Sequence, residues 1–473
     1  MKAVHCAAVD LGASSGRVIV GSWVRGRLSL REVHRFPVQF RSLGDEDYWD
    51  LPTLWSEVRA GLLKARLEFP GLASVGVDTW GVDYALVDRV GRLVYPVHAY
   101  RDRRTQPGLK RLARTGLGRI YAETGVPNVF YNTSLQLEAM LRNHPRVRET
   151  ADRCLFLPDY FNFLLSGRME NEVSISSTSQ LLGLSRRTWS GAALRRFGIP
   201  ARWFRRPVPA GTRLGKVASI PELKGMSVIA VPGHDTACAY DAMPADPSGT
   251  DLFISSGTWS LVGFESARPL VGVEALRARI SNERTGRGGF RPLTNVIGLW
   301  LLERTLVDLG CRPESGADWE ALLSRAGRLP APRRLLDVTS PAFANPPSMR
   351  REVDKQLRSR GEAPPRDPAG YARLICDSLG AGHADAARTF ERLSGKVFRR
   401  ILIVGGGSKN PLLCQATADQ SSLPVVSFQI EGTAVGNIAS QLVAHGAVAD
   451  LSTFRQQFGS SLKQVLYTPR REA

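Results

Sequence analysis

Residues 3–9 are mostly apolar, and apolar and polar residues alternate with a period of two over residues 18–23 and 28–36, patterns that predict strands rather than helices. A turn of small residues over 10–17 and the pair Arg25-Gly26 divide this region into hairpins. After this region, apolar residues recur with helical spacing, and short apolar runs follow. The predicted strands are residues 3–9, 18–23, 28–36, 74–78 and 84–87, and the predicted helix is 54–67. This order predicts a sheet of hairpins that continues into a β-α-β unit.

The second half of the chain begins in the same way as the first. A strand at 252–254, a turn of small residues at 255–258 and a strand at 259–264 form a weak internal repeat. Other predicted elements are helices at 160–165, 410–418 and 434–444 and strands at 228–231, 400–404 and 425–427, whereas 328–370 is rich in Pro and Arg and predicts irregular surface structure.

Domain boundaries follow from the segment 244–249, which holds two prolines, an Asp, a Ser and a Gly between apolar runs. The length of 473 residues predicts two or three domains at about 100–200 residues each. We expect an N-terminal domain over 1–243, a linker over 244–249, a C-terminal domain over 250–446 and a tail over 447–473.

Composition narrows the class of protein. With 43% apolar and 23% charged residues the chain is of ordinary globular type, and no apolar run approaches the ~20 residues that cross a bilayer. The six cysteines are far apart with no zinc spacing, so we expect reduced thiols in a cytoplasmic protein. The net charge of +19 could indicate a nucleic-acid surface, but scattered arginine doublets favour a codon bias toward Arg over a nucleic-acid partner.

Four turns at strand ends carry candidate chemistry. In the turn over 10–17, backbone amides can approach phosphate oxygens, Asp10 can hold Mg²⁺ and Arg17 can neutralise phosphate charge, although a plain hairpin turn is the alternative. His234-Asp235-Thr236 follows a strand and opens a helix, where a carboxylate can be a general base or only a helix cap. The turns at 255–258 and 405–410 suit an anion or a nucleotide.

Longer strings around these turns resemble one family in order along the chain. They are AVDLGASSGRVIV, VGVDTWGVDYALVD, AYRDRRT, LPDYFNFLLSG, GHDTACA, ISSGTWSLVGFE, NVIGLWLLER and LIVGGGSKNPLL. Together they resemble the FGGY family of carbohydrate kinases from about residue 4 to about residue 445.

The resemblance implies an α/β fold of two actin-like (ribonuclease-H-like) domains with the active site in the cleft between them. It implies an ATP-dependent kinase that uses Mg²⁺ and phosphorylates the 1-hydroxyl of L-rhamnulose. The implied partners are small molecules, with no nucleic acid or membrane, for a monomer or homodimer. L-Fuculose as substrate, or an inactive actin-like sugar sensor, are alternatives, and the presence of both Asp10 and Asp235 opposes the inactive sensor.

The same resemblance assigns roles residue by residue. Asp235 is the implied catalytic base and Asp10 the implied metal ligand. The implied ATP-binding residues are Ala13, Ser14, Ser15, Gly16, Arg17, Thr258, Glu303, Gly406 and Asn410, and the implied sugar-binding residues are Gly81, Asp83, His234, Asp235, Thr236 and Asn295. The chain departs from the family pattern at Glu303, where the pattern has Gln, and at Gly233, where it has Ser.

Overall fold

The structure is a computed structural model that describes residues 3–114, 118–185, 188–344 and 346–470. Its contacts divide the chain into two units. Unit 1 comprises Met1–Pro244, Glu265–Pro292 and Glu431–Ser461, and unit 2 comprises Ala245–Phe264, Leu293–Ile430 and Leu462–Ala473. The chain first passes between them within the predicted linker. The contiguous boundaries that we predict from the sequence do not include the two later returns to unit 1.

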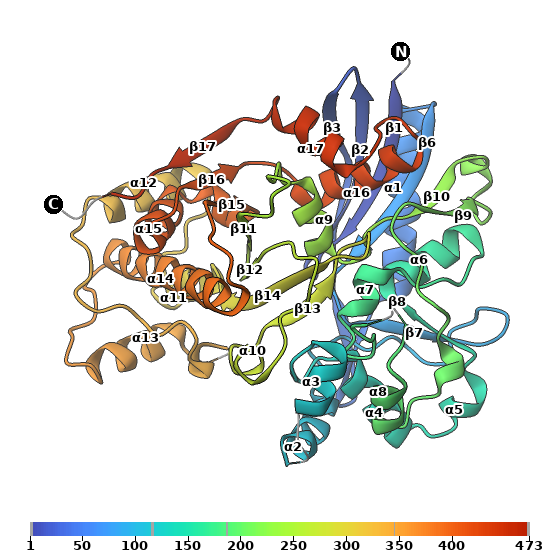
Figure 1. Cartoon of the computed structure of the whole chain (residues 1–473), viewed down its shortest axis with the longest axis horizontal. Helices are drawn as coiled ribbons and strands as arrows, with labels where there is room; N and C mark the ends of the chain where they lie inside the picture. Colours follow the sequence, from blue (N-terminus) through green and yellow to red (C-terminus); the bar gives the residue numbers. More distant parts are fainter. Residues whose placement is uncertain (1–2, 115–117, 186–187, 345, 471–473) are drawn as a thin grey trace. The chain divides into compact units, whose positions relative to one another are not determined.

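Unit 1 is built on a six-stranded sheet with the order β3-β2-β1-β6-β10-β9. Its strands are β1 (Val4–Leu11), β2 (Ser15–Val24), β3 (Arg27–Pro37), β4 (Phe40–Leu43), β5 (Glu46–Trp49), β6 (Leu72–Thr79), β7 (Tyr84–Val87), β8 (Arg153–Phe156), β9 (Thr212–Lys216), β10 (Ser227–Ala230) and β13 (Ser281–Arg284). Its helices are α1 (Leu51–Glu68), α2 (Gln106–Arg114), α3 (Gly118–Thr124), α4 (Thr133–Asn143), α5 (Val147–Thr150), α6 (Leu157–Ser166), α7 (Val173–Ser177), α8 (Gly191–Arg196), α9 (Asp235–Ala242), α10 (Val273–Arg277), α16 (Gly432–Ala444) and α17 (Leu451–Gly459), with short 3₁₀ turns η1 (Arg103–Thr105), η2 (Ala201–Trp203) and η3 (Pro221–Leu223). Figure 1 shows these elements coloured along the sequence.

The main core of unit 1 lies against this sheet. Helix α1 begins at the N-cap Asp50, whose side chain accepts a hydrogen bond from the Thr53 amide, and it buries Leu54, Val58 and Leu62 at a spacing of four residues. These side chains pack with the alternating inward residues of β1, β2 and β6. The alternation seen in the sequence therefore sets which face of the sheet the core covers.

Strand β7 differs from the prediction. We expect residues 84–87 to continue the sheet of residues 74–78, but β7 instead pairs with β8 in a separate two-stranded sheet. Between β6 and β7 the backbone of Val82 takes a φ of 72°, which redirects the chain. Tyr84 then belongs to a second hydrophobic core, formed with α4, α8 and their neighbours.

Unit 2 is built on a sheet of order β13-β14-β12-β11-β15-β16-β17, in which the β13–β14 hairpin belongs to the chain segment that passes from unit 1 into unit 2. Its strands are β11 (Asp251–Ser256), β12 (Trp259–Gly263), β14 (Phe290–Ile297), β15 (Arg400–Val404), β16 (Val425–Phe428) and β17 (Gln464–Tyr467). Its helices are α11 (Trp300–Asp308), α12 (Gly316–Gly327), α13 (Met349–Arg358), α14 (Pro368–Ser394) and α15 (Pro411–Ser421), with 3₁₀ turns η4 (Pro341–Phe343) and η5 (Gly406–Lys409).

The internal repeat extends to five strands. In unit 1 the row β3-β2-β1-β6-β10 has two antiparallel pairings followed by two parallel ones. In unit 2 the row β14-β12-β11-β15-β16 has the same order of directions. This duplicated topology is the actin-like (ribonuclease-H-like) fold that we expect, and it places the 10–17 and 255–258 turns at equivalent positions.

Two helices replace structure that we predict to be irregular. Within 328–370, α13 begins at Ser348, whose side chain accepts from the Arg351 amide. The longest helix, α14, begins within the same segment at its N-cap Asp367 and ends at Gly395 with a φ of 70°. Glycine in its middle permits a close approach, since a Cβ on Gly380 would lie 2.6 Å from the backbone of Ala416 in α15.

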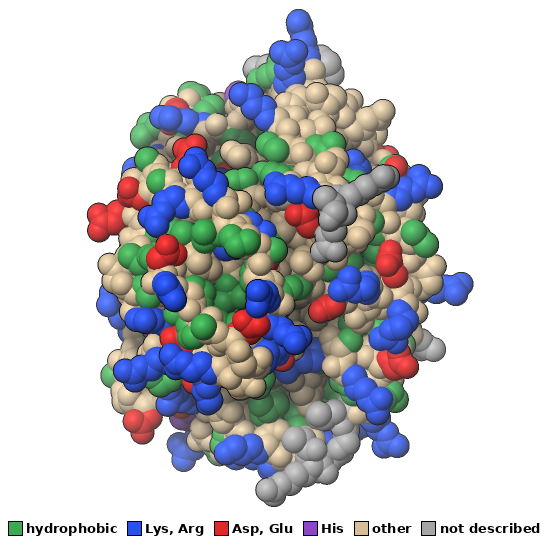
Figure 2. All heavy atoms as spheres, turned by 90° about the vertical axis from the view of Figure 1, so that its left-hand side faces the viewer, with side chains coloured by type: hydrophobic (Ala, Val, Ile, Leu, Met, Phe, Trp, Pro, Cys, Tyr) green, Lys and Arg blue, Asp and Glu red, His purple; other side chains and the backbone are tan. Residues whose placement is uncertain are grey.

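Surface composition agrees with scattered rather than clustered charge. Figure 2 shows one face, on which Lys and Arg side chains are spread among Asp and Glu side chains. None of the helices in the described part of the chain combines the length and the apolar character needed to cross a bilayer.

Candidate active site

Three charged residues form a row across the sheet of unit 1. Arg17 on β2 stands opposite Asp10 on β1, and Asp10 stands opposite Asp78 on β6. Residues in register on neighbouring strands direct their side chains to the same face. Arg17 Nη2 donates to Asp10 Oδ2 at 2.9 Å, and the same guanidinium forms an ion pair with Glu431, which precedes α16.

Negative charge exceeds positive charge around this row. Burial raises the pKa of Asp10 to about 6 although Arg17 opposes the rise, and Asp235 and Glu431 add to it. Burial, together with the charge of Asp10, also raises the pKa of Asp78 well above its usual range. A site with several carboxylates and one Arg therefore favours a further cation.

The available oxygen atoms fit Mg²⁺. Asp78 Oδ2 accepts from Asn437 Nδ2 at 2.6 Å, whereas Asp78 Oδ1 is buried without a hydrogen-bond partner. The described residues contain no cluster of three or more His, Cys, Asp or Glu side chains arranged for a metal. Mg²⁺ bound with a nucleotide commonly takes only one or two carboxylates, and phosphate and water oxygens complete its shell. Asp10 and Asp78 meet that requirement.

The turn between β1 and β2 is shorter than predicted. It comprises residues 12–14, and the Gly12 amide donates to Ser15 O at 3.0 Å. Ala13 is half-buried and Ser14 exposed, so both belong to the accessible turn. Gly16 instead lies inside β2, where a Cβ would stand 2.3 Å from the Phe36 ring. Glycine is needed at this position because the Phe36 ring occupies the space of a side chain.

Asp235 is positioned by the chain that follows β10. Gly233 O accepts from the Thr79 amide at 2.9 Å, which places this turn beside the end of β6 and Asp78. Asp235 is then the first residue of α9, and its Oδ1 accepts from the amide and the hydroxyl of Thr236 at 2.6 and 3.2 Å. His234 Nε2 lies 3.3 Å from the same oxygen.

The second oxygen of Asp235 is available. Every hydrogen bond that the described residues make to this carboxylate ends on Oδ1, and the side chain is 31% exposed. A carboxylate with one oxygen held by hydrogen bonds and the other without one can accept a proton from a bound hydroxyl group. The alternative, that the Asp235 carboxylate is only the N-cap of the helix, does not match the structure, because the N-cap position of α9 is His234 and Asp235 follows it inside the helix.

Gly81 lies beside His234, and Asp83 is buried among other side chains. A Cβ on Gly81 would lie 3.4 Å from His234 Nε2, so the two sit together. Asp83 is fully buried and accepts from the indoles of Trp49 and Trp80, at 2.6 and 2.8 Å, and from Gln136 at 3.1 Å. Burial raises its pKa to about 6 despite these bonds. Asp83 is therefore held by other side chains of unit 1, and its place in the sugar site stays a prediction.

The departure at Gly233 has a packing cause. A Cβ at this position would lie 2.9 Å from Ile175 Cγ2 and 3.0 Å from Pro158 Cγ. Those side chains occupy the space that the Ser of the family pattern would need. The Gly233 amide is also held, because it donates to Glu172 Oε2 at 2.9 Å.

Four of the predicted nucleotide residues lie in or beside converging loops of unit 2. The Leu299 amide donates to Gly257 O at 2.9 Å, and the Gly298 amide donates to Thr258 O at 3.1 Å. A Cβ on Gly405 would lie 2.5 Å from Ser256 O, so the glycine loop packs on the same turn. Thr258 and Gly406 are exposed on these loops, Glu303 follows in α11, and Asn410 follows the glycine loop.

Two of the predicted residues of unit 2, Asn410 and Asn295, have particular surroundings. Asn410 is buried and caps α15, with its side chain accepting from the Leu413 amide at 3.0 Å and donating to Cys376 Sγ at 3.6 Å. Its side chain therefore serves the fold of the loop. Asn295 is exposed on β14, opposite Leu261 of β12.

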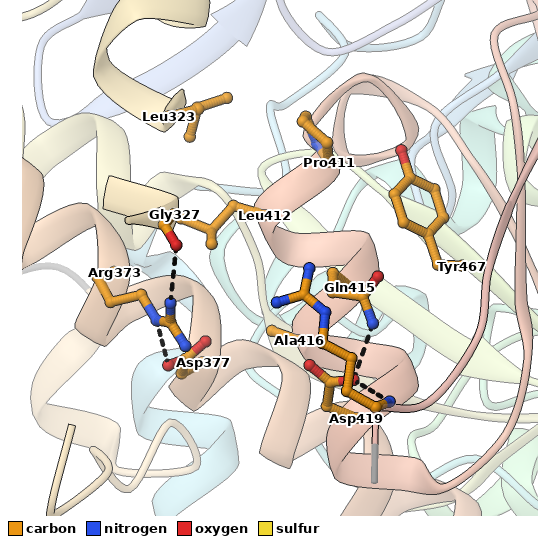
Figure 3. A pocket seen from close by; sticks show the side chains of 11 residues that line it. Leu323, Gly327, Arg373, Asp377, Pro411, Leu412, Gln415, Ala416, Asp419 and Tyr467 are labelled. Atoms are coloured by element: carbon orange, nitrogen blue, oxygen red, sulfur yellow. Dashed lines mark hydrogen bonds and ion pairs between the residues drawn. The ribbon is translucent and has the colours of Figure 1, made fainter. Parts of the chain in front are cut away.

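The clearest pocket of unit 2 lies away from these loops. It measures about 200 Å³ and is lined by residues of α12, α14, α15 and β17 (Figure 3). Both of its carboxylates are already engaged, since Arg373 Nε donates to Asp377 at 2.7 Å and Gln415 donates to Asp419 at 2.8 Å. None of the predicted site residues lines it, so we do not assign it the chemistry.

Three residues of the site were missed in the sequence. Asp78 carries a visible signal, because like Asp10 it is an Asp at the end of a short buried strand. Glu431 and Asn437 carry no such signal, because they reach the row from a helix far along the chain. Sequence spacing does not show that α16 packs against β1 and β6.

Comparisons with known proteins agree with this geometry. The chain matches the FGGY family of carbohydrate kinases, with the N-terminal domain over residues 5–240 and the C-terminal domain over 252–445. A rhamnulokinase of Klebsiella pneumoniae subsp. pneumoniae is 39% identical over 470 residues, which cover 98% of this chain and 94% of that protein. A rhamnulokinase of Pectobacterium carotovorum is 38% identical over 479 residues, which cover 100% of this chain and 95% of that protein.

Solved structures show the same fold at low identity. A gluconate kinase from Lactobacillus acidophilus has a TM-score of 0.78 at 15% identity, covering 99% of this chain and 94% of that one. A xylulose kinase from Rhodospirillum rubrum has a TM-score of 0.78 at 17% identity, covering 98% and 94%. The duplicated fold and these matches define an ATP-dependent carbohydrate kinase. The chain belongs to the FGGY family of carbohydrate kinases.

Proposed function

We propose that this chain transfers the γ-phosphoryl group of ATP to the 1-hydroxyl of L-rhamnulose. The observation that carries the proposal is the Asp235 carboxylate, whose Oδ1 accepts from the amide and the hydroxyl of Thr236 and lies 3.3 Å from His234 Nε2, whereas the described residues make no hydrogen bond to Oδ2. The identity to rhamnulokinases along almost the whole chain supports the choice of sugar over L-fuculose.

In this proposal each residue of unit 1 has a chemical task. Asp235 Oδ2 accepts the proton of the attacking hydroxyl, a contribution of typically ~10²–10⁴-fold. Asp10 and Asp78 would hold Mg²⁺, which when bound neutralises phosphate charge. Arg17 and the amides of Ala13 and Ser14 contact phosphate oxygens. Charge neutralisation and positioning supply most of the catalysis in phosphoryl transfer.

The loops of unit 2 are proposed to bind the nucleotide. Thr258 and Gly406 lie exposed on loops that contact each other, and Glu303 follows from the adjoining helix. We propose that Asn295 contributes to the sugar site. Asn410 supports the nucleotide loop through its cap of α15.

The remaining proposals concern the protein's surroundings. The partners are small molecules rather than nucleic acid, and the protein acts as a monomer or homodimer. Each of the six cysteines is a free thiol, a state that suits the reducing cytoplasm in which we place the protein.

A panel of ketoses tests this function. ADP release from ATP and Mg²⁺ is measured with L-rhamnulose, L-fuculose, D-xylulose and glycerol at several concentrations. We expect the highest kcat/KM for L-rhamnulose, because a site built for particular hydroxyls discriminates strongly against their loss. A higher kcat/KM for L-fuculose or D-xylulose would assign another substrate. An absence of turnover with every sugar would favour the inactive sensor.

A further inference from the structure

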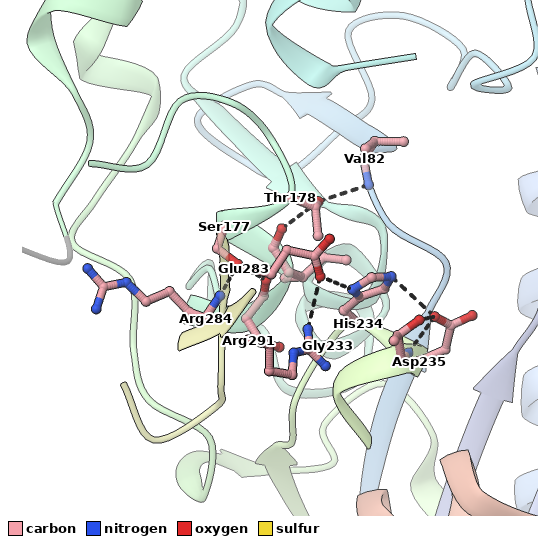
Figure 4. Close-up of polar contacts among 12 residues, drawn as sticks. Val82, Ser177, Thr178, Gly233, His234, Asp235, Glu283, Arg284 and Arg291 are labelled. Atoms are coloured by element: carbon pink, nitrogen blue, oxygen red, sulfur yellow. Dashed lines mark hydrogen bonds and ion pairs between the residues drawn. The ribbon is translucent and has the colours of Figure 1, made fainter. Parts of the chain in front are cut away.

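A buried glutamate lies behind the proposed base. Glu283, on β13, is 7% exposed, and its Oε2 accepts from Arg291 Nη2 at 2.9 Å. The same oxygen lies 2.9 Å from Nδ1 of His234. Figure 4 shows the resulting chain of contacts from Arg291 through Glu283 and His234 to Asp235. No motif in the sequence marks Glu283.

The bond at Nδ1 fixes the direction of the other ring nitrogen. With Nδ1 held by Glu283, His234 Nε2 lies 3.3 Å from Asp235 Oδ1 and beside Gly81. A carboxylate at Nδ1 requires a proton on that nitrogen. A proton on Nε2 as well lets the ring donate toward Asp235 and toward the sugar position.

The charges around His234 favour this doubly protonated form. The charged groups that face it are Glu283 from β13, Asp235 from α9 and Arg291 from β14. Burial opposes the charge on the imidazole, but the two carboxylates outweigh burial and Arg291, and the pKa of His234 is raised. The pKa of Glu283 is lowered, since His234 and Arg291 together exceed the effect of burial.

Hydrogen bonds from two backbone amides to side chains of α7 and its N-cap hold Glu283 and His234 at a fixed separation. Ser177 Oγ, in α7, accepts from the Arg284 amide at 2.8 Å, one residue after Glu283. Glu172, the N-cap of α7, accepts from the Gly233 amide at 2.9 Å, one residue before His234. One short helix thus holds the strand of Glu283 and the turn of His234, as Figure 4 shows in part.

We infer that Glu283 is a positioning residue of the kinase, which orients His234 so that Nε2–H engages Asp235 Oδ1 and leaves Asp235 Oδ2 for the sugar hydroxyl. The inference rests on the proposed function for its catalytic consequence. The orientation of the ring itself is a property of the protein without substrate. The two can therefore be measured apart.

The first experiment observes the ring directly. The protein is labelled with ¹⁵N-histidine, and the signal of His234 is assigned by its loss in His234→Gln. We expect the two ring nitrogens to stay protonated to a higher pH in the wild type than in Glu283→Gln. Glu57→Gln, which removes the same charge beside His34 at 2.6 Å, is the matched control and should leave His234 unchanged.

The second experiment measures turnover against pH. Glu283→Gln should lower kcat roughly 10–100-fold, as expected for a misdirected catalytic group, and should move the alkaline limb of kcat to lower pH. Glu283→Asp keeps the charge, so it should keep His234 protonated and recover part of kcat. Glu57→Gln should retain the wild-type profile.

The outcomes separate the inference from the function. A His234 ring that stays protonated to the same pH in Glu283→Gln as in the wild type, or a fall in kcat without any shift of the pH limb, would overturn the positioning role and leave only a structural one. Wild-type inactivity on all ketoses would contradict the proposed function, while the ¹⁵N signals would still test the orientation. If Glu283→Gln does not fold, Glu283→Asp and the wild-type signal decide the question.

Discussion

Gly436 offers a sharp test of how the proposed base is positioned. Helices α9 and α16 lie side by side (Figure 1), and a Cβ on Gly436 would stand 1.8 Å from the backbone oxygen of Cys238. Asp235 opens α9, and Asn437, next to Gly436, donates to Asp78. A Gly436→Ala substitution is therefore expected to displace both Asp235 and the row formed by Arg17, Asp10 and Asp78.

The size of the effect follows from that contact. Because real Cβ contacts do not fall below 3.0 Å, the helices must separate by about 1.2 Å. Overpacking of this kind costs about 1–3 kcal/mol of unfolding free energy. A displacement of about 1 Å at a catalytic group can lower turnover by roughly 10²-fold. We expect Gly436→Ala to lose at least about 10-fold in kcat and to melt several degrees lower.

The assay pairs kcat for L-rhamnulose with the melting temperature. Gly327→Ala is the control, since nothing lies within 4 Å of the Cβ it would add at the end of α12. It should keep wild-type turnover and stability. A Gly436→Ala enzyme with wild-type kcat and melting temperature would refute the close helix crossing and its role in placing Asp235.

Three further predictions concern packing, protonation and charge. Gly233→Ser should destabilise the protein by about 1–3 kcal/mol in urea unfolding, because the new side chain meets Ile175 and Pro158; an unchanged midpoint would contradict this. Asp83 has a pKa near 6 when folded against a usual 3.8, so the folded state binds its proton more tightly and the unfolding free energy should fall as pH rises from about 4 to about 6. The difference in unfolding free energy between the wild type and Asp83→Asn should decrease by up to roughly 3 kcal/mol over that pH range and stay level outside it. A difference that does not change with pH would refute the raised pKa of Asp83. Binding to random DNA should be weak at about 0.15 M salt and weaken steeply as salt rises, whereas tight, salt-resistant binding would restore the nucleic-acid alternative.

Local patterns predict the elements that carry most of the site. Alternating residues predict β1, β2 and β3, and apolar runs ended by Asp predict β6 and the neighbourhood of Asp10. The hydrophobic face of each of these elements is formed by residues that lie close together in the sequence, so a short window is enough to detect its period. The strand β15 is predicted with the same bounds that the structure gives.

Long-range packing explains what the sequence does not predict. Helix α16 follows β16 in the chain yet belongs to unit 1, because its Gly436 face packs against α9. Helix α14 contains Gly380, a residue that weakens a helical pattern and here admits α15. Glu283 lies on a four-residue strand outside every motif, and only the fold brings it to His234.

Asp235 is the residue on which the proposed phosphoryl transfer depends most directly, because it takes the proton of the attacking hydroxyl. Asp235→Asn keeps the size of the side chain and leaves an amide that cannot take the hydroxyl proton. Steady-state turnover with L-rhamnulose, ATP and Mg²⁺ should fall by at least ~10²-fold, while the dissociation constant for ATP stays near the wild-type value. Turnover near the wild-type rate would contradict the account and remove Asp235 from the mechanism.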